Sequence, residues 1–260
     1  MTDNNLVKIK DLTPKQIASI CDHTFLHRPE AYREKTPKGQ NPIKMWEDDF
    51  NNFLKQAVNR SLMPYSICVR PENCEYVRDF LDQNGKKEIV LAATVGFPYP
   101  SHHSTKFKVF EAELAIDHGA KEIDMVLDYE KLKKGDIEYV KNDVNIVTWL
   151  AHERKAVVKL ILETSELNIE QIKHACKIAD ECNVDFVKTS TGFSAEGAKI
   201  EHVKIMKENF SKGVKISGFV NVDNVKELLK AASGREDGYI DLDPMKVRIG
   251  ESSLLKALQQ

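Results

Sequence analysis

The stretch that decides the fold is "VDFVKTSTGFSAEGAKIEHVKIMKENFSKGVKIS", residues 184–217. It begins with a short apolar run at 184–189 and ends with another at 213–217, and both have the length of a buried strand. Between the two runs, four apolar residues fall on one side of a helix: Ile200, Val203, Met206 and Phe210. Two buried strands joined by a helix predict a parallel pair, because parallel strands need such a crossover.

The same alternation of strand and helix runs through most of the chain. The other predicted strands are 21–25, 64–69, 88–97, 121–127, 156–162 and 246–250, and a helical pattern follows each one. Eight such units in 260 residues predict an α/β fold, a (β/α)₈ TIM barrel with one domain over residues 1–260. An open doubly wound sheet is the alternative, but no G-x-G-x-x-G follows the first good strand.

Two segments lie outside this alternation. Residues 1–20 precede the first unit and are predicted to form an N-terminal helical extension. Residues 27–44 are charged and interrupted by proline, so they are predicted to be an inserted loop, mobile and a candidate lid.

The spacing of apolar residues also predicts which helical faces are buried. Phe107, Phe110 and Leu114 mark one face of a helix over 105–118, and Trp46 and Trp149 fall within helical patterns and are expected to pack. A single helix is expected between the strand at 121–127 and about residue 150.

Composition excludes several classes of partner. The net charge is −2 and both signs are interspersed, so no basic face is predicted for nucleic acid and no polybasic patch for a membrane. A small-molecule partner is therefore expected. The five cysteines are odd in number and lack C-x-x-C spacing, which argues against a disulfide framework or a zinc knuckle. Without a signal-peptide core or an apolar run of about 18 residues, the expected location is the cytoplasm.

Three charged residues lie in or at the end of predicted barrel strands, namely Asp124, Lys188 and Lys215. Each has an ordinary explanation, since a strand lysine often reaches solvent at a rim and an aspartate often caps a loop. Their coincidence on three strands favours catalysis, because barrel enzymes place reactive groups where the strands end. Two ammonium groups in one desolvated space repel, so one lysine should carry a free amine, the nucleophile of a Schiff base. Asp124 would move protons in that chemistry.

A second feature predicts an anion site. The stretch "RIGESSLL", 248–255, ends a strand in glycine and opens a helix with Ser252 and Ser253. In barrels of this kind the loops after strands seven and eight usually bind phosphate. An ordinary serine N-cap is the alternative. The adjacent pair His102–His103 lacks a third ligand for a metal, and Cys68 is expected to be a pocket or core residue.

The chain resembles the deoxyribose-phosphate aldolases, class I enzymes with a TIM-barrel fold. The motifs that carry this resemblance span about residues 20–258 and are "DHTFL" (22–26), "SICVRP" (66–71), "VGFP" (95–98), "EAELAIDHGAKEIDMV" (111–126), "VKLILET" (158–164), "DFVKTSTGF" (185–193), "VKISG" (214–218) and "IGESSL" (249–254). The resemblance implies reversible cleavage of 2-deoxy-D-ribose 5-phosphate to D-glyceraldehyde 3-phosphate and acetaldehyde, with no metal or organic cofactor.

The same resemblance implies a role for individual residues. Lys188 matches the Schiff-base lysine, Lys215 the lysine that lowers its pKa, and Asp124 the acid/base relay. The implied substrate-binding residues are Asp22, Thr24, Cys68, Thr189, Gly192, Gly218, Ser252 and Ser253. The implied partners are small phosphorylated sugars and aldehydes, and a homodimer is one expected assembly.

The chain departs from the family after "VKISG", where the family usually has a second glycine and then an arginine. Here Phe219 and Asn221 occupy those positions. A side chain in place of glycine can crowd the approach of an anion, and the lost cation weakens attraction for phosphate. The alternatives are therefore an aldolase-like barrel acting on a different substrate, or one serving as a binding or interaction protein. A metal-dependent aldolase is a third, disfavoured by the missing ligands.

Overall fold

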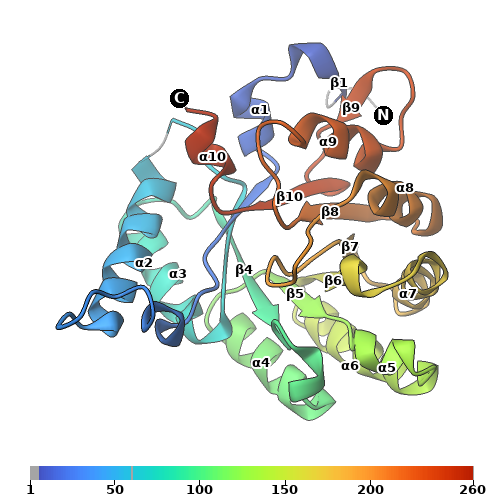
Figure 1. Cartoon of the computed structure of the whole chain (residues 1–260), viewed down its shortest axis with the longest axis horizontal. Helices are drawn as coiled ribbons and strands as arrows, with labels where there is room; N and C mark the ends of the chain where they lie inside the picture. Colours follow the sequence, from blue (N-terminus) through green and yellow to red (C-terminus); the bar gives the residue numbers. More distant parts are fainter. Residues whose placement is uncertain (1–5, 60, 260) are drawn as a thin grey trace.

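Eight parallel strands close into a barrel in the computed structural model, which describes residues 6–59 and 61–259 (Figure 1). Their order around the barrel is β10-β2-β3-β4-β5-β6-β7-β8, so neighbours in sequence are neighbours in space. The predicted TIM barrel is confirmed. The barrel strands are β2 (Cys21–Thr24), β3 (Ser66–Val69), β4 (Val90–Val95), β5 (Glu122–Val126), β6 (Val157–Ile161), β7 (Phe186–Lys188), β8 (Gly213–Ser217) and β10 (Val247–Glu251).

Helices surround the barrel and cover the outward side of its strands (Figure 1). They are α1 (Pro14–Ala18), α2 (Pro42–Asn59), α3 (Cys74–Gln83), α4 (Thr105–Asp117), α5 (Tyr129–Lys133), α6 (Ile137–Glu153), α7 (Ile169–Glu181), α8 (Ile200–Asn209), α9 (Val225–Ser233) and α10 (Leu254–Ala257). Local capping fixes where several begin. The Asn168 side chain, for example, accepts from the Gln171 backbone N–H, while the Gln171 side chain accepts from that of Asn168.

The two sides of the strands differ in chemistry. Outward residues such as Ile123, Val158 and Ile216 are completely buried in the main apolar cluster together with residues of the helices. Residues one position away, such as Asp124 and Lys159, point to the other side, because side chains alternate along a strand. This alternation lets the apolar layer hold the fold together while the inside of the barrel carries polar groups.

Two expectations about helices differ from the structure. The single helix expected after β5 is two helices, α5 and α6, separated at Gly135, whose φ of 78° is not helical. On α4, Phe107 and Phe110 are 47% and 57% exposed, so the predicted buried face is wrong. The buried side of α4 instead includes Lys108, whose ammonium is bonded to Asp143 and the Val126 carbonyl.

The two tryptophans also differ from one another. Trp46 packs partly buried against the core and donates from Nε1 to the His27 carbonyl. Trp149 is 62% exposed on α6, so the expectation that it packs is wrong. Helical spacing alone did not distinguish the two, because it locates a residue on a helix without saying which side meets the barrel.

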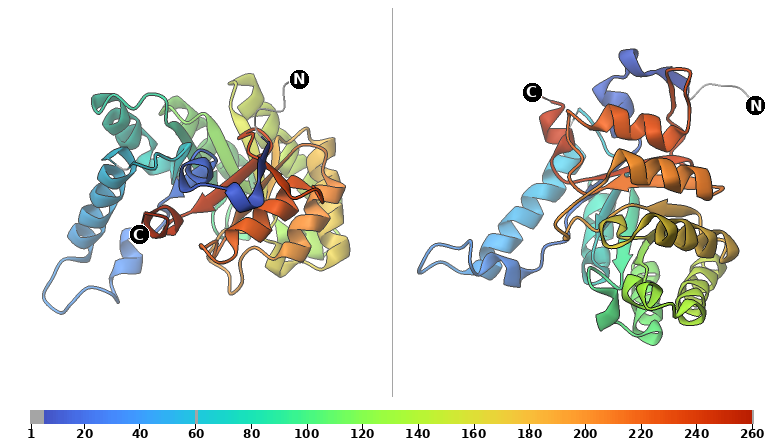
Figure 2. Two further views of the ribbon diagram at one scale, coloured as in Figure 1. Left: turned by 90° about the horizontal axis from the view of Figure 1, so that it is seen from above. Right: turned by 45° about the vertical axis from the view of Figure 1, so that its right-hand side comes forward.

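The segments outside the strand–helix alternation have their own structure. Residues 1–5 of the predicted N-terminal extension lie outside the described residues; the remainder forms β1 (Leu6–Lys8), a 3₁₀ turn and α1, and β1 pairs antiparallel with β9 (Tyr239–Asp241). Residues 27–44 contain a 3₁₀ helix at Pro29–Tyr32 and then turns before α2, and they extend away from the barrel (Figure 2). In the described ranges, no helix is both long and apolar enough to cross a membrane.

Candidate active site

Asp124, Lys188 and Lys215 meet inside the barrel. Asp124 comes from β5, Lys188 from the last position of β7 and Lys215 from β8, where the two lysines are directly paired in the parallel register. Both ammonium nitrogens contact the same carboxylate oxygen, Asp124 Oδ2, at 2.8 Å from Lys188 Nζ and 2.7 Å from Lys215 Nζ. Their side chains are 0–3% exposed. The convergence of three strands predicted from the sequence is therefore present.

Four more charged side chains extend this group deeper into the barrel. Asp22 bonds to Lys215 and to Arg248, and Glu122 accepts from Arg248 Nη2 at 2.9 Å. Lys159 reaches Glu122 Oε2 at 2.5 Å and Asp124 Oδ1 at 2.8 Å. We name these seven residues (Asp22, Glu122, Asp124, Lys159, Lys188, Lys215 and Arg248) the central charge cluster.

Sequence reasoning missed Glu122, Lys159 and Arg248. A signal was present in the sequence. Each of the three is a charged residue within an apolar strand, at a position whose side chain points into the barrel because side chains alternate along a strand. Glu122, for example, precedes Asp124 by two residues in "EIDMV". Charged residues spaced by two in a strand otherwise rich in valine and isoleucine point into a barrel together.

The cluster gives its members different proton affinities. Burial lowers the pKa of Lys188, and the Lys215 ammonium lowers it further, against the opposing effect of Asp124. Burial also acts to lower the pKa of Lys215, but Asp124 and Asp22 outweigh it and the net shift is upward. Asp124 has a pKa well below its usual range, since Lys159, Lys188 and Lys215 together outweigh its burial. Of the two lysines, Lys188 is therefore the one that gives up its proton more readily.

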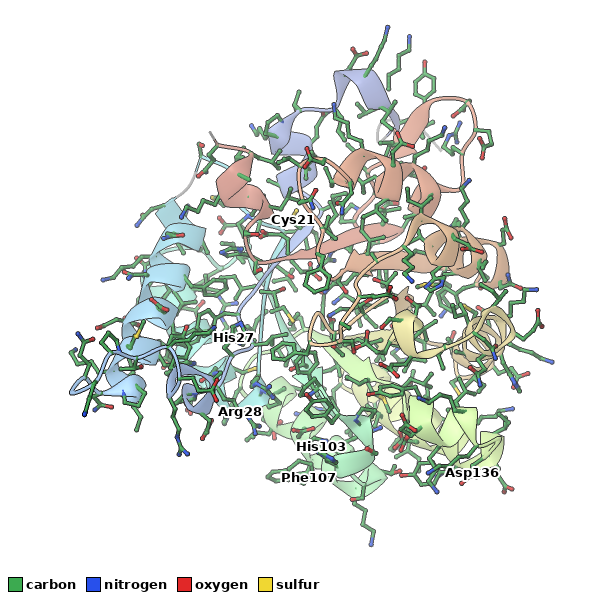
Figure 3. The ribbon with its side chains drawn as sticks, in the orientation of Figure 1. Cys21, His27, Arg28, His103, Phe107 and Asp136 are labelled. Carbon is green, nitrogen blue, oxygen red and sulfur yellow. The ribbon has the colours of Figure 1, made fainter. Side chains whose placement is uncertain are left out.

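A cavity of about 510 Å³ opens above the cluster, and the ends of β2, β7, β8 and β10 contribute to its wall. Six predicted site residues line it: Thr24, Lys188, Gly192, Gly218, Ser252 and Ser253. His27, labelled in Figure 3, lines it too. Among the described residues of the central charge cluster, Lys188 is the one that lines the cavity.

Five predicted site residues lie below or behind the cavity wall. Asp22, Asp124 and Lys215 are members of the cluster and have no exposed surface. Thr189 is also buried; its hydroxyl donates to the Ser217 carbonyl and accepts from the Ser217 N–H, so it ties β7 to β8. Cys68 is buried on β3, and burial, aided by Asp124, raises the pKa of its thiol to about 11.

The loops after β7 and β8 lie in close contact. Gly218, at a φ of 86°, accepts from the Ala198 N–H, and a Cβ on Gly197 would lie 2.2 Å from the Gly218 carbonyl oxygen. Phe219 follows at a φ of 56°, a left-handed conformation that is costly for an aromatic residue, and its side chain is 61% exposed. The Asn221 side chain accepts from the N–H groups of the next turn and so fixes the start of α9.

These loops present unused backbone donors to the cavity. Within the described residues, the N–H groups of five lining positions make no hydrogen bond: Gly192, Gly218, Phe219, Ser252 and Ser253. Unpaired N–H groups gathered at one wall favour an anion. Among all residues that the structure describes, no group of three or more histidine, cysteine, aspartate or glutamate side chains is arranged to hold a metal ion.

Comparisons with known proteins find relatives along most of the chain. The model of the DeoC/LacD family aldolases matches residues 17–260. The deoxyribose-phosphate aldolase of Thermococcus kodakarensis is 40% identical over 227 residues, 86% of this chain and 93% of that protein. The deoxyribose-phosphate aldolase of Caldicellulosiruptor saccharolyticus is 34% identical over 86% of this chain and 94% of that protein.

A solved structure shares the fold. The tetrameric deoxyribose phosphate aldolase from Aeropyrum pernix matches with a TM-score of 0.72 over 96% of this chain and 93% of that one. At 23% identity, this likeness shows the barrel architecture alone.

Proposed function

Because the chain belongs to the DeoC/LacD family of aldolases, we propose that it cleaves 2-deoxy-D-ribose 5-phosphate through a Schiff base on Lys188. The products are D-glyceraldehyde 3-phosphate and acetaldehyde, and the reaction is reversible. The observation that carries the proposal is the position of Lys188, a buried amine with a lowered pKa that is the cluster member lining the cavity.

The first step is attack of the Lys188 amine on the aldehyde carbon of the open-chain sugar. The carbinolamine then loses its oxygen as water and leaves a protonated imine. Lys215 stays an ammonium and so opposes protonation of Lys188. Asp124, bonded to both nitrogens through one oxygen, is in a position to pass a proton between them.

Carbon–carbon cleavage uses the imine as an electron sink. A base removes the proton of the C3 hydroxyl, the C2–C3 bond breaks, and its electron pair moves into an enamine on Lys188 while C3 leaves as the aldehyde of glyceraldehyde 3-phosphate. Protonation of the enamine at C2 and hydrolysis of the imine release acetaldehyde. Asp124, by direct transfer or through a water, is our candidate for relaying these protons.

The unpaired N–H groups at the cavity wall support binding of the phosphate. Hydrogen bonds from backbone amides and serine hydroxyls hold an anion without a cationic side chain. The family's arginine position is occupied by Asn221, whose side chain is engaged in the turn before α9. Phosphate affinity in this chain therefore depends on the backbone of Gly192, Gly218 and Ser252–Ser253.

A second candidate is an aldolase whose substrate lacks the phosphate. Phe219 favours it, because an exposed aromatic ring on the cavity wall suits an uncharged group better than an anion. The two candidates share the Schiff base and differ in the distal end of the substrate. A binding protein that makes no imine is the remaining alternative.

Trapping the imine separates these functions. The protein is incubated with 2-deoxyribose 5-phosphate, reduced with borohydride, and the modified residue is located by mass spectrometry. We expect an adduct on Lys188, absent from Lys188→Ala, and a loss of cleavage activity on the order of 10⁴-fold or more in that variant. Equal rates with unphosphorylated 2-deoxyribose would favour the second candidate. The absence of any adduct would exclude both aldolases, and loss of activity with EDTA would favour a metal-dependent reaction.

Two further expectations stay predictions, namely the cytoplasmic location and a homodimeric assembly. The five cysteines are free and buried, as a reducing compartment allows. Size-exclusion chromatography with light scattering measures the assembly directly.

A further inference from the structure

The central charge cluster contains more cationic groups than carboxylates. Its cations are Lys159, Lys188, Lys215 and Arg248, and its carboxylates are Asp22, Glu122 and Asp124. All seven side chains are 0–3% exposed. With every group in its usual charged form, four positive charges face three negative ones and one positive charge is left over. A net charge inside a barrel, out of contact with water, is costly unless a group gives up its proton.

The contacts decide which group gives up the proton. Lys215 bonds to Asp22 and Asp124, and Lys159 lies within 2.8 Å of both Glu122 and Asp124. Each of these ammonium groups is therefore held by at least two carboxylates.

Arg248 is held in the same way. Its guanidinium bonds to Asp22 and Glu122, and its Cζ lies 3.9 Å from the centre of the Tyr65 ring. An arginine also keeps its proton in proteins.

Lys188 has the weakest hold on its proton. It contacts one carboxylate, and it shares the contacted oxygen with Lys215. The cluster becomes neutral when this one amine is uncharged, with three cations against three carboxylates.

We propose that Glu122, Lys159 and Arg248, which do not line the cavity, are positioning residues that select Lys188 as the uncharged amine through the charge balance of the cluster. Lys215 alone does not make this selection. It repels a charged Lys188, but Lys188 equally repels it, and the pair becomes unequal because Lys215 shares Asp22 with the deeper groups. Asp22 is in turn fixed by Arg248, and Asp124 by Lys159.

The proton affinities of the separate groups agree with this assignment. Burial lowers the pKa of Lys188 below its usual value. Burial also acts to lower the pKa values of Lys159 and Lys215, but the carboxylates that these lysines contact outweigh it and raise both. Burial acts to lower the pKa of Arg248, but Asp22 and Glu122 outweigh it and the net shift is upward.

Within the described residues, the other titratable groups around Lys188 form no ion pair with a member of the cluster. Cys68 on β3 has its thiol pKa raised to about 11 by burial, so it is neutral. Glu163, which follows β6, is bonded to the Thr191 N–H and hydroxyl in the next loop. At the cavity wall, His23 Nδ1 lies 2.5 Å from Glu251 Oε1, and that pair belongs to the outer side of β2 and β10. His27 and Asp49 line the cavity from the side of α2.

Opposite substitutions test the proposal. Lys159→Met removes a cation, so the cluster is neutral with Lys188 protonated and the free amine forms only at higher pH. Glu122→Gln removes a carboxylate and keeps its shape, so protonation of Lys188 becomes less favourable and the free amine persists to lower pH. The acid limb is the low-pH side of the pH profile, where activity falls as Lys188 becomes protonated. We expect it to move by about one pH unit, upward in Lys159→Met and downward in Glu122→Gln.

The readout is the pH dependence of imine formation with acetaldehyde, trapped on Lys188 by cyanoborohydride and quantified by mass spectrometry. The inference rests on the proposed Schiff base but not on the identity of the sugar, so a wrong substrate leaves this readout intact. If no adduct forms at any pH, the proposed function fails. If adducts form but the acid limb stays in place, the charge-balance proposal alone fails.

Two further variants complete the design. The double variant Glu122→Gln with Lys159→Met removes one charge of each sign, so its acid limb should return to that of the original protein. Lys108→Met is a matched control, because Lys108 is also a completely buried lysine, paired with Asp143 at 2.6 Å, but lies outside the barrel. It should lower the melting temperature without moving the acid limb.

Three outcomes would overturn the proposal. These are shifts of the same sign in the two single variants, a double variant that stays shifted, or an equal shift in Lys108→Met. If Lys159→Met fails to fold, Glu122→Gln alone decides, because it preserves the shape of the side chain and a downward shift is still required.

Discussion

The centre of the barrel and the loops around its cavity are built by different means. In the centre, seven charged side chains are buried and each is bonded to at least one group of opposite charge. Around the cavity, the wall consists of unpaired backbone N–H groups, serines, glycines at positive φ and exposed aromatic rings such as Phe219. The centre is a closed set of mutual contacts, whereas the rim leaves its donors for a ligand.

This difference separates chemistry from recognition. A change in the centre alters the charge of Lys188, so it should appear in the rate and in the pH profile. A change at the rim alters how the distal part of the substrate is held, so it should appear in KM while imine formation stays intact. Substitutions in the two regions can therefore break or sharpen the comparison.

After the replacement of Lys188 itself, the largest effect is expected at Lys215, in the centre. Lys215→Leu removes the ammonium that, after burial, most lowers the pKa of Lys188, so that pKa should rise. The free amine is then scarce at neutral pH and returns as the pH increases. We expect activity at pH 7 to fall about 100-fold and the acid limb to move upward by roughly one to two units. Rate profiles measured across pH check both. An unmoved acid limb would refute the role assigned to Lys215.

A smaller effect is expected at Gly218, in the rim. In Gly218→Ala the new Cβ would lie 3.0 Å from Gly197 Cα, at a φ of 86° that alanine rarely adopts. A cost on the order of 1–2 kcal/mol should displace the N–H groups offered to the phosphate and raise KM about tenfold. Trapping of the acetaldehyde imine on Lys188 should be unchanged.

The chain offers a matched control for that variant. Gly39 has a φ of 91° with no atom within 4 Å of an added Cβ, and it lies in the segment that extends away from the barrel. Gly39→Ala should carry a similar backbone cost and leave KM alone. If Gly218→Ala lowered the rate of imine formation with KM unchanged, the division between centre and rim would be wrong.

How far the sequence predicted this molecule depends on the kind of residue. Strands were predictable because short apolar runs that alternate with helical patterns, such as the one at 213–217, are typical of buried parallel strands. Asp124, Lys188 and Lys215 were predictable as a group because charged residues at strand ends meet in a closed barrel. Their partners Lys159 and Arg248 were not identified, since one charge in an apolar strand does not reveal which residue neutralises it.

The prediction of which helical faces are buried failed in the outer layer of helices, because contacts between helices decided it. On α4 the apolar residues Phe107 and Phe110 face outward, and Lys108 is buried. The choice was made by tertiary contacts, namely the bond from Lys108 to Asp143 on α6 and the close approach of its chain to Gly96. The spacing of apolar residues cannot reveal a buried ion pair between helices, because it treats both partners as polar and therefore as exposed.

The smallest effect is expected at Phe219, the residue that most distinguishes this rim from the family pattern. Its φ of 56° is unfavourable for a side chain and costless for glycine, so Phe219→Gly should relieve strain and raise stability by roughly 0.5–1 kcal/mol. If the ring crowds the anion, KM for the phosphorylated sugar should also fall a few-fold while the acid limb stays in place. Lys155→Gly is the control, since Lys155 has a φ of 58° at the end of α6, away from the cavity wall. It should share the gain in melting temperature without the change in KM. A higher KM in Phe219→Gly would mean that the aromatic ring binds the substrate, and the rim would then select an uncharged distal group over phosphate.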